Sequence, residues 1–276
     1  MTGKIDTGRD AYRAFYDGGL TAVLSAAWGG NLHLGFFERP GQTLAEAQLN
    51  TKRHLAKTAG LRRGSTVIEV ACGVGGSARF LAQECDAQVL ATNIAETQLD
   101  EGRRAAAAEG LGDRVRFAFA DYHDLSALAE NASFDCWWCQ EALLYAADKP
   151  RVLREARRVV KAGGRLVMTD LLLTGMASPD ERVALRRDIR APEMITIEEW
   201  DAIIAGQGFE VVAREDWRKH AGPTFEAVLA SLMARRVELV AIAGEELVAG
   251  TEFRVTRQRD AARAGNLGWG CWVLQV

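Results

Sequence analysis

The segment 66–78 constrains the fold of this chain more than any other stretch. It reads Thr-Val-Ile-Glu-Val-Ala-Cys-Gly-Val-Gly-Gly-Ser-Ala, so an apolar run leads directly into a glycine-rich turn. The residues after the turn have the pattern of a helix. Glycine lets the backbone approach a nucleotide closely, and the first turn of a helix offers unpaired N–H groups. The segment is therefore typical of the strand–turn–helix unit at which doubly wound sheets bind nucleotides.

Strand-like and helix-like segments alternate from this point onward. We expect strands at 66–71, 88–93, 114–120, 134–140 and 165–171. We expect helices between them at 77–85, 96–109, 125–129 and 149–160, with the Lys-Ala-Gly-Gly of 161–164 as a helix stop and turn. Strands that alternate with helices predict a parallel sheet covered on both faces.

The last third of the chain is richer in helical patterns. They dominate 179–206, and a strand at 209–217 precedes a long helical stretch at 224–263. An apolar strand at 267–276 ends the sequence. Because no linker or low-complexity segment divides the chain, we expect one domain with helical additions.

Charge and hydropathy exclude several function classes. The net charge is −3, from 34 basic and 37 acidic residues, whereas proteins that bind nucleic acid concentrate basic charge. No apolar stretch is long enough to span a bilayer, and the first residues have no signal-peptide pattern. We therefore expect a cytoplasmic enzyme that binds neither nucleic acid nor a membrane.

The cysteines do not predict a metal site. Cys136 and Cys139 form a Cys-Trp-Trp-Cys sequence that could be taken for a zinc or redox motif. The surrounding segment 134–140 has the pattern of a buried strand, and residues three apart on a strand point to opposite faces. We expect no metal, because two thiols placed in this way cannot share an ion.

Two nucleotide cofactors could occupy the glycine-rich turn. Gly73 and Gly75 also begin a match to the dinucleotide pattern G-x-G-x-x-G/A. That pattern needs an acidic residue about 20 positions later to hold a ribose, and Asn93 stands there instead. Glu69, before the turn, could orient the loop or the cationic end of S-adenosylmethionine, and Asp121 could accept a hydrogen bond from an adenine amino group. These features favour S-adenosylmethionine over NAD.

Four segments carry the motifs of one known family. The Trp-Gly-Gly-Asn-Leu-His-Leu-Gly of 28–35 resembles its Trp-Gly-Gly-x-x-Ile-His-x-Gly, and 93–98, 139–149 and 266–270 resemble further motifs. The family is the class I S-adenosylmethionine-dependent methyltransferases, and within it the sarcosine/dimethylglycine N-methyltransferases and related methyltransferases of antibiotic pathways. The resemblance implies a Rossmann-like, doubly wound mixed α/β sheet, mostly parallel with the last strand antiparallel, with helical additions at the N-terminus and in a cap.

The same resemblance divides the chain into parts with different tasks. Residues 1–62 would form an N-terminal helical lid, 63–175 the cofactor-binding core, 176–264 a cap on the acceptor side, and 265–276 the last strand. In the lid, Tyr12 and Tyr16 could close over the cofactor or simply pack. A homodimer is a further expectation.

Nine residues are expected to bind S-adenosylmethionine or its product S-adenosylhomocysteine. The resemblance places the methionine part on Glu69, Gly73 and Gly75, and the ribose on Asn93 and Gln98. It places the adenine against Ile94, Asp121 and Tyr122, and the sulfonium end near Gln140. The sequence departs from the family at Ala71, where a glycine is usual and the space should narrow. It also departs at Tyr145, which replaces a histidine, and after Asp170, where Leu-Leu-Leu replaces Pro-Met.

Four side chains are candidates for the chemistry. Methyl transfer needs alignment, and removal of a proton where the acceptor carries one. Asp170 ends the fifth strand and could be the base, or could cap the next segment. His33 could orient the acceptor, accept a proton or pack in the structure. Glu141 could contact the acceptor or cap a helix, and Tyr145 lies where the acceptor is expected.

Aromatic and basic residues could shape the acceptor site. An aromatic wall around an amine or an apolar ring could be formed by Trp28, Phe36, Phe37 and Trp269, although we expect at least two of them to belong to the core. Arg190 could bind a carboxylate with its planar guanidinium, but an exposed helix explains its position equally well.

Several functions agree with these observations. The first is an N-methyltransferase that acts on a small amine or amino acid. The second is an O- or C-methyltransferase that acts on an apolar natural product in secondary metabolism. A nicotinamide-dependent oxidoreductase and a non-catalytic cofactor-binding protein also stay open, because fold does not determine function.

Overall fold

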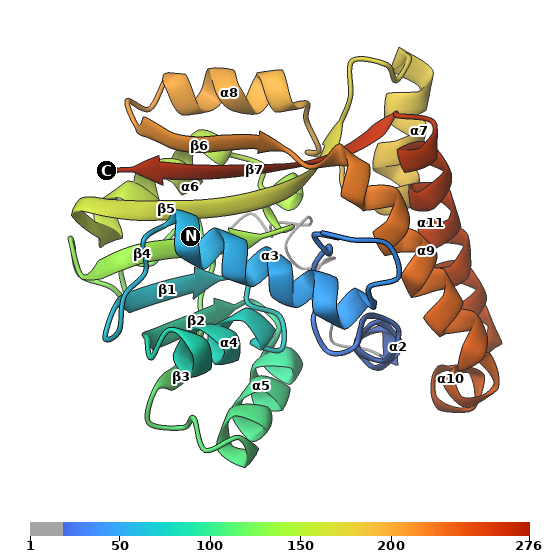
Figure 1. Ribbon diagram of the computed structural model, residues 1–276, viewed down its shortest axis with the longest axis horizontal. Helices are drawn as coiled ribbons and strands as arrows, with labels where there is room; N and C mark the ends of the chain where they lie inside the picture. Colours follow the sequence, from blue (N-terminus) through green and yellow to red (C-terminus); the bar gives the residue numbers. More distant parts are fainter. Residues whose placement is uncertain (1–18) are drawn as a thin grey trace, which may run out of the picture.

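One seven-stranded sheet organises the protein (Figure 1). The computed structural model describes residues 19–276, and Tyr12, Tyr16 and the start of the expected lid lie outside them. The strands are β1 (Thr66–Val70), β2 (Gln88–Asn93), β3 (Val115–Phe119), β4 (Phe134–Gln140), β5 (Val160–Leu173), β6 (Glu210–Asp216) and β7 (Leu267–Gln275). Their order is β3-β2-β1-β4-β5-β7-β6, and β7 runs antiparallel to both of its neighbours while the other pairs are parallel. The predicted mixed sheet with an antiparallel last strand is confirmed.

Helices cover both faces of the sheet and one of its ends. Those beside the strands are α3 (Leu44–Thr58), α4 (Gly76–Glu84), α5 (Glu96–Ala108), α6 (Lys149–Val159) and α8 (Ile197–Ala205). A second group is α2 (Gly19–Trp28), α7 (Pro179–Ile189), α9 (Arg218–Ala234), α10 (Arg236–Ala243) and α11 (Glu245–Arg263). In Figure 1 this second group lies at the right, beyond the carboxyl ends of the parallel strands.

The central strand β4 shows how the sequence pattern becomes a two-sided core. Cys136 and Trp138 pack into the hydrophobic cluster on one face of the sheet, and Trp137 and Cys139 pack into the cluster on the other. All four side chains are fully buried. The alternation follows from the two-residue period of a strand, so the prediction that the two thiols face opposite ways is confirmed. A strand buried on both faces carries apolar residues at nearly every position.

Two local predictions were wrong. Residues 125–129 form turns instead of a helix, with the N–H groups of Leu128 and Ala129 both bonded to the Leu125 carbonyl. Five residues make too few hydrogen bonds to offset the cost of starting a helix. Residues 161–164 belong to β5 instead of a turn before it. The pairing of this part of β5 with β4 is irregular, since the register shifts after Phe134. On the other side, the Gly163 N–H donates to the Val276 carbonyl.

The long helical stretch is divided into three helices. α9 ends before Arg235, and Gly244 separates α10 from α11. α11 folds back along α9, and α7 packs beside it, which produces the upright bundle at the right of Figure 1.

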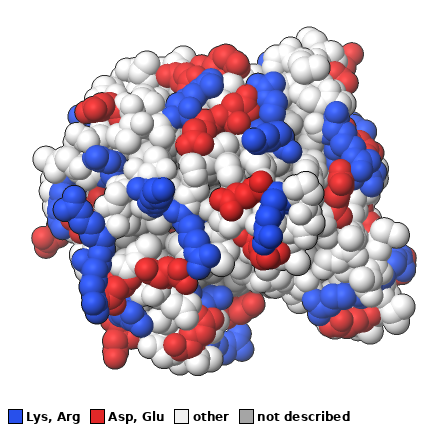
Figure 2. Space-filling model, viewed as in Figure 1, with Lys and Arg blue, Asp and Glu red and all other residues white. Residues whose placement is uncertain are grey.

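The surface carries charges of both signs. On the face shown in Figure 2, basic and acidic side chains lie close to one another over the whole width of the protein. Among residues 19–276, no helix is both long enough and apolar enough to cross a bilayer.

Candidate active site

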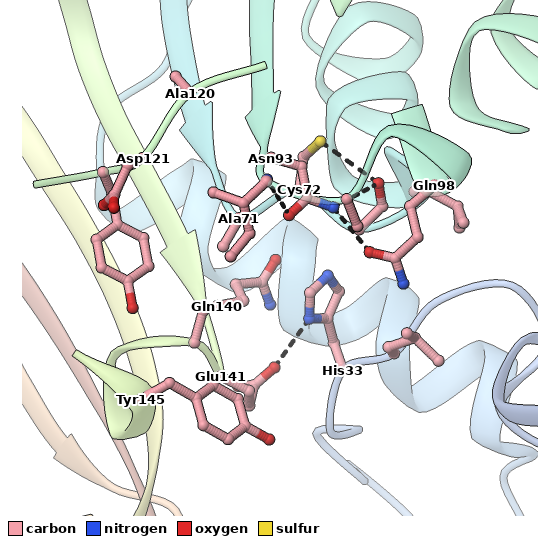
Figure 3. A pocket seen from close by; sticks show the side chains of 18 of the residues that line it. His33, Ala71, Cys72, Asn93, Gln98, Ala120, Asp121, Gln140, Glu141 and Tyr145 are labelled. Carbon is pink, nitrogen blue, oxygen red and sulfur yellow. Dashed lines mark hydrogen bonds and ion pairs between the residues drawn. The ribbon is translucent and has the colours of Figure 1, made fainter. Parts of the chain in front are cut away.

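A cavity lies at the carboxyl ends of β1, β2, β3 and β4, where a doubly wound sheet leaves room for a ligand (Figure 3). The segment 30–33, the glycine-rich turn, the short 3₁₀ helix η1 (Leu143–Tyr145) and the loop before α8 complete its walls. The cavity brings together these predicted residues: His33, Gly73, Asn93, Ile94, Gln98, Asp121, Tyr122, Gln140, Glu141 and Tyr145. They are spread over more than 110 positions of the sequence.

The glycine-rich turn has a left-handed backbone at three places. Ala71 (φ 52°), Gly73 (φ 56°) and Gly75 (φ 72°) all adopt it. For a residue with a Cβ atom this conformation costs roughly 1–2 kcal/mol, which explains why a glycine suits position 71. The φ of Ala71 shows that the turn keeps its left-handed shape with alanine there. Ala71 lines the cavity, whereas Gly75 does not. A Cβ atom on Gly75 would come within 2.5 Å of the Phe117 ring, so this glycine makes room for a side chain behind the turn.

Two amide side chains meet where β2 passes into α5. The Asn93 Nδ2 donates to Gln98 Oε1 at 2.7 Å, and Asn93 Oδ1 accepts the Ile94 N–H at 2.9 Å. Both side chains are buried except where they face the cavity. Amides donate and accept hydrogen bonds, which fits the two hydroxyls of a ribose.

At the other end of the cavity, Asp121 is oriented by the residue two positions later. Asp121 Oδ1 accepts the backbone N–H of His123 at 2.9 Å and lies 2.7 Å from His123 Nδ1. Tyr122 lies against the His123 ring. His123 lines the cavity too, although the sequence analysis did not single it out. Its position directly after the predicted Asp121 and Tyr122 could have indicated that it lines the same site.

Gln140 lines the cavity and carries a buried amide donor. Its Oε1 accepts from Ser77 Oγ at 2.7 Å and from Trp138 Nε1 at 2.9 Å. An indole N–H can only donate, so these two bonds identify which end of the amide is the oxygen. Gln140 Nε2 is buried and has no hydrogen-bond partner in the described part of the chain. A buried N–H without a partner is costly, so this group is suited to a ligand atom that accepts a hydrogen bond.

His33 and Glu141 form a pair at the cavity wall. His33 Nδ1 lies 3.0 Å from Glu141 Oε2, and both side chains are largely buried. The other carboxylate oxygen, Oε1, accepts from Thr169 Oγ1 at 2.5 Å and from Trp269 Nε1 at 2.8 Å. Figure 3 shows the imidazole facing Gln140 across the cavity. The arrangement can hold a histidine in one orientation while its second nitrogen faces a ligand.

The loop that carries His33 is held from behind by α3. Gln48 Nε2 donates to the carbonyl oxygens of Asn31 at 2.7 Å and His33 at 2.9 Å. Lys52 Nζ donates to Asn31 Oδ1 at 3.2 Å. These buried contacts connect an N-terminal helix to the cavity, and the sequence analysis did not anticipate them.

Glu69 supports the turn from inside the protein and does not line the cavity. Burial raises the pKa of Glu69 to about 8, although the positive charge of Lys52 and the Ala78 N–H act in the opposite direction. Burial also lowers the pKa of Lys52 to about 8. The structure therefore places Glu69 where it can orient the loop, one of the two roles predicted for it.

Asp170 does not face the cavity as predicted. It follows Thr169 on β5, and because side chains alternate along a strand, Thr169 reaches Glu141 while Asp170 points to the other side. Burial raises the pKa of Asp170 to about 8, with the charge of Lys149 acting in the opposite direction. Its position outside the cavity lining does not support the assignment as the base.

The residues predicted to contact the acceptor lie outside the cavity lining. Trp28 packs edge-on against Phe225, and Trp269 holds Glu141. Both are buried in the core, which confirms the expectation for at least two of the aromatic residues. Phe36 packs between the rings of other residues, and Arg190 ends α7 with a left-handed backbone. Pro192 and Glu193 line the cavity instead; the sequence analysis did not single them out.

The charged side chains that line the cavity are acidic. Among the described residues that line the cavity, Asp121, Glu141 and Glu193 have acidic side chains and none is lysine or arginine. A ligand that carries a carboxylate would find no guanidinium or ammonium group among them.

Comparisons with known proteins agree with this geometry. Residues 68–168 match the model of a family described as "Methyltransferase domain". The chain is 30% identical over 253 residues to the 27-O-demethylrifamycin SV methyltransferase of Amycolatopsis mediterranei, covering 90% of this chain and 88% of that protein. It is 26% identical to the glycine/sarcosine/dimethylglycine N-methyltransferase of Actinopolyspora halophila over 88% of this chain, but spans only 43% of that protein. Among solved structures, the cyclopropane synthase MmaA2 of Mycobacterium tuberculosis superposes with a TM-score of 0.86 at 20% identity, over 97% of this chain and 98% of that one.

Proposed function

The chain belongs to the S-adenosylmethionine-dependent methyltransferases, and on that premise we propose that it methylates a hydroxyl oxygen of an uncharged small molecule. Membership confirms the prediction made from the sequence motifs and disfavours the nicotinamide alternative. The acceptor and the methylated atom are the proposed part.

The observation that carries the proposal is the contact between His33 and Glu141. A hydroxyl is a poor nucleophile until it loses its proton, so its methylation gains from a base beside it. His33 lines the cavity, and Glu141 at 3.0 Å from Nδ1 orients the ring and would stabilise the positive charge that it acquires with the proton. Thr169 and Trp269 hold Glu141 in turn.

The donor on Gln140 supports an oxygen acceptor. A hydroxyl oxygen has two lone pairs, so it can accept a hydrogen bond from Gln140 Nε2 and still attack a methyl group. A neutral amine nitrogen has one lone pair, which such a bond would occupy. Oε1 of the same amide already accepts two hydrogen bonds, so it is poorly placed to accept from an amine.

The charge of the lining supports an acceptor without a carboxylate. No described lining side chain is a lysine or arginine, so a glycine derivative would find no such ion-pair partner there. The carboxylate of the cofactor would instead meet the backbone N–H groups at the start of α4. The rifamycin relative, named for an O-methylation, fits a natural product of secondary metabolism better.

The cavity fits the cofactor of the family. Bound S-adenosylmethionine supplies a methyl group already activated by its sulfonium charge. We propose that Gly73 and the start of α4 hold the methionine end, that Asn93 and Gln98 hold the ribose, and that Asp121 holds the adenine edge. Ile94 and Tyr122 would pack on the adenine ring. The left-handed, open backbone at Gly73 and the amide pair at the end of β2 support this assignment.

N-methylation of an amine is the second candidate. The three carboxylates of the lining would attract a cation, and one relative is named for the methylation of glycine, sarcosine and dimethylglycine. We also keep as proposals the lid at 1–62, the acceptor-side cap at 176–264, a homodimer and a cytoplasmic location.

A product screen tests the proposal. The protein would be incubated with S-adenosylmethionine carrying a deuterated methyl group, first with 27-O-demethylrifamycin SV and a set of neutral phenols and alcohols, then with glycine, sarcosine and dimethylglycine. Mass spectrometry of the products should show labelled methyl ethers. Labelled amines in the absence of any labelled ether would overturn the O-methylation proposal and favour the second candidate.

A further inference from the structure

Lys149 is a buried lysine that has no part in the proposed proton transfer by His33 and Glu141. It begins α6 and is 5% exposed. Its Nζ donates to the carbonyl oxygens of Ala146 at 3.0 Å and Glu193 at 2.5 Å, and lies 5.8 Å from the centre of a Trp200 ring. Burying an ammonium group is costly unless its bonds are satisfied, so a lysine at this position calls for an explanation.

The two carbonyl groups belong to different walls of the cavity. Ala146 lies between Tyr145 and Ala147, and both of these line the cavity. Glu193 and its neighbour Pro192 line it from the other side. The turn 145–147 follows β4, whereas 192–193 belong to the loop between α7 and α8, so Lys149 joins two segments that are separate in the sequence.

The other hydrogen bonds of the loop lead away from this turn. Arg186 Nε donates to the Met194 carbonyl at 3.0 Å, which holds the loop to α7. The Leu173 N–H donates to Ile195 at 3.0 Å, which holds it to β5. The bond from Lys149 to Glu193 thus reaches the part of the loop that faces the cavity.

Asp170 is a second buried ionisable group in this region. It lies on β5 outside the cavity lining. Burial of both groups works against the charged forms, lowering the pKa of Lys149 and raising that of Asp170. Neither Lys149 nor Asp170 lines the cavity, so an effect of either on a ligand would be transmitted through the walls.

We propose that Lys149 is a positioning residue that holds the two walls of the acceptor end of the cavity together. The proposal rests on the proposed function in one respect, since it takes this end of the cavity to be the acceptor site.

A double variant tests the bridge. Lys149→Met alone would leave a carboxyl group buried beside an apolar chain and could unfold the protein, so Lys149→Met is combined with Asp170→Asn. Hydrogen exchange, measured with S-adenosylhomocysteine bound, should become faster in 142–148 and 190–196 and stay unchanged in β1 and β2. With the hydroxyl acceptor found in the product screen, KM should rise about tenfold, kcat should change less, and calorimetry should give a Kd for S-adenosylhomocysteine within about twofold of the original. Lys149→Arg should restore most of the acceptor affinity, because a guanidinium can still donate to both carbonyls.

Arg157 provides a matched control. It lies on the same helix and donates to two loop carbonyls, those of Gln207 at 2.9 Å and Gly208 at 3.1 Å, away from the cavity. Arg157→Met should leave KM unchanged. Unchanged exchange in both segments of a folded double variant would overturn the bridge, and so would a loss of S-adenosylhomocysteine affinity as large as the rise in KM. A wild-type protein that methylates no hydroxyl compound would contradict the proposed function, while the exchange comparison would still decide the bridge.

Discussion

His33 Nδ1 lies 3.0 Å from Glu141 Oε2, although the two residues are 108 positions apart in the sequence. One comes from the segment after α2 and the other from the end of β4. Glu141 adopts a left-handed backbone (φ 46°), which is unfavourable for a residue with a Cβ atom. Strained backbone that is held by its surroundings is frequent at functional sites. Here the Thr169 carbonyl accepts the Glu141 N–H at 2.8 Å, and the strained turn directs the carboxylate toward His33.

The first prediction concerns His33 as the base. His33→Ala should lower kcat by roughly 10²–10⁴-fold with a hydroxyl acceptor, the usual scale for a proton-transfer group, while the Kd for S-adenosylhomocysteine stays the same. Added imidazole should restore part of the rate, because it can accept the proton in the vacated space. His54 is the control, since it makes a similar contact with Glu215 at 2.9 Å outside the cavity. Full activity in the His33 variant would remove this residue from the mechanism.

The second prediction concerns the donor on Gln140. In Gln140→Glu, a carboxylate oxygen can still accept from Ser77 and Trp138, but the second oxygen, which replaces Nε2, does not donate when ionised. Turnover of a hydroxyl acceptor should fall by about 10–100-fold, the equivalent of losing a 1–3 kcal/mol hydrogen bond. Calorimetry with S-adenosylhomocysteine separates the alternatives. If affinity for this product falls as far as turnover, the Gln140 donor binds the cofactor instead of the acceptor.

The third prediction concerns the ribose. Gln98→Ala should weaken binding of S-adenosylhomocysteine by about 1–3 kcal/mol, because it removes a polar partner in a desolvated site. Thermal melting without ligand should show a smaller change. Gln88→Ala, at an exposed position of β2, is the matched control and should bind normally. Normal binding by a folded Gln98 variant would contradict the assignment.

The fourth prediction compares two glycines of the turn. Gly73 and Gly75 share a left-handed backbone, so alanine at either position costs roughly 1–2 kcal/mol of strain. A Cβ atom at Gly73 would meet nothing within 4 Å, whereas at Gly75 it would collide with Phe117. Gly75→Ala should therefore lower the free energy of unfolding by more than Gly73→Ala, as measured with urea. Equal losses would mean that Phe117 moves aside at little cost. Gly73→Ala should weaken cofactor binding, because Gly73 lines the cavity and Gly75 does not.

The fifth prediction concerns acid stability and His220. This histidine is buried, its Nδ1 accepts the Phe37 N–H at 3.2 Å, and burial, with Lys219 in support, lowers its pKa from 6.5 to about 4. Between these two values the unfolded chain binds more protons than the folded protein, so stability should increase with pH from about 4 to 6.5. His220→Gln can still accept the Phe37 N–H but does not titrate. Urea unfolding at several pH values should give a smaller slope for the variant in this window. An unchanged slope would assign the acid sensitivity to other groups.

Sequence patterns were sufficient to predict the central sheet and the helices beside it. The apolar strands and the turn at 66–78 specify a doubly wound sheet, because a strand buried on both faces and a helix beside it each have a characteristic period. The same turn indicated a nucleotide site, and the resemblance to the class I methyltransferases implied which residues at the ends of β2, β3 and β4 belong to it. The carboxyl ends of parallel strands meet at one edge, so these residues lie together. Ten of the predicted residues therefore line one cavity.

Tertiary structure alone decided which side chains face that cavity. Thr169 and Asp170 are neighbours in the sequence, yet the pleat of β5 sends the first toward Glu141 and the second away from the cavity. Trp269 belongs to β7, whose place beside β5 brings its indole to Glu141. The loop that carries Glu193 lies at the cavity, where Lys149 on α6 donates to the Glu193 carbonyl. Each of these relationships joins distant segments through packing, and the local periods of a sequence contain no information about which distant segments will meet.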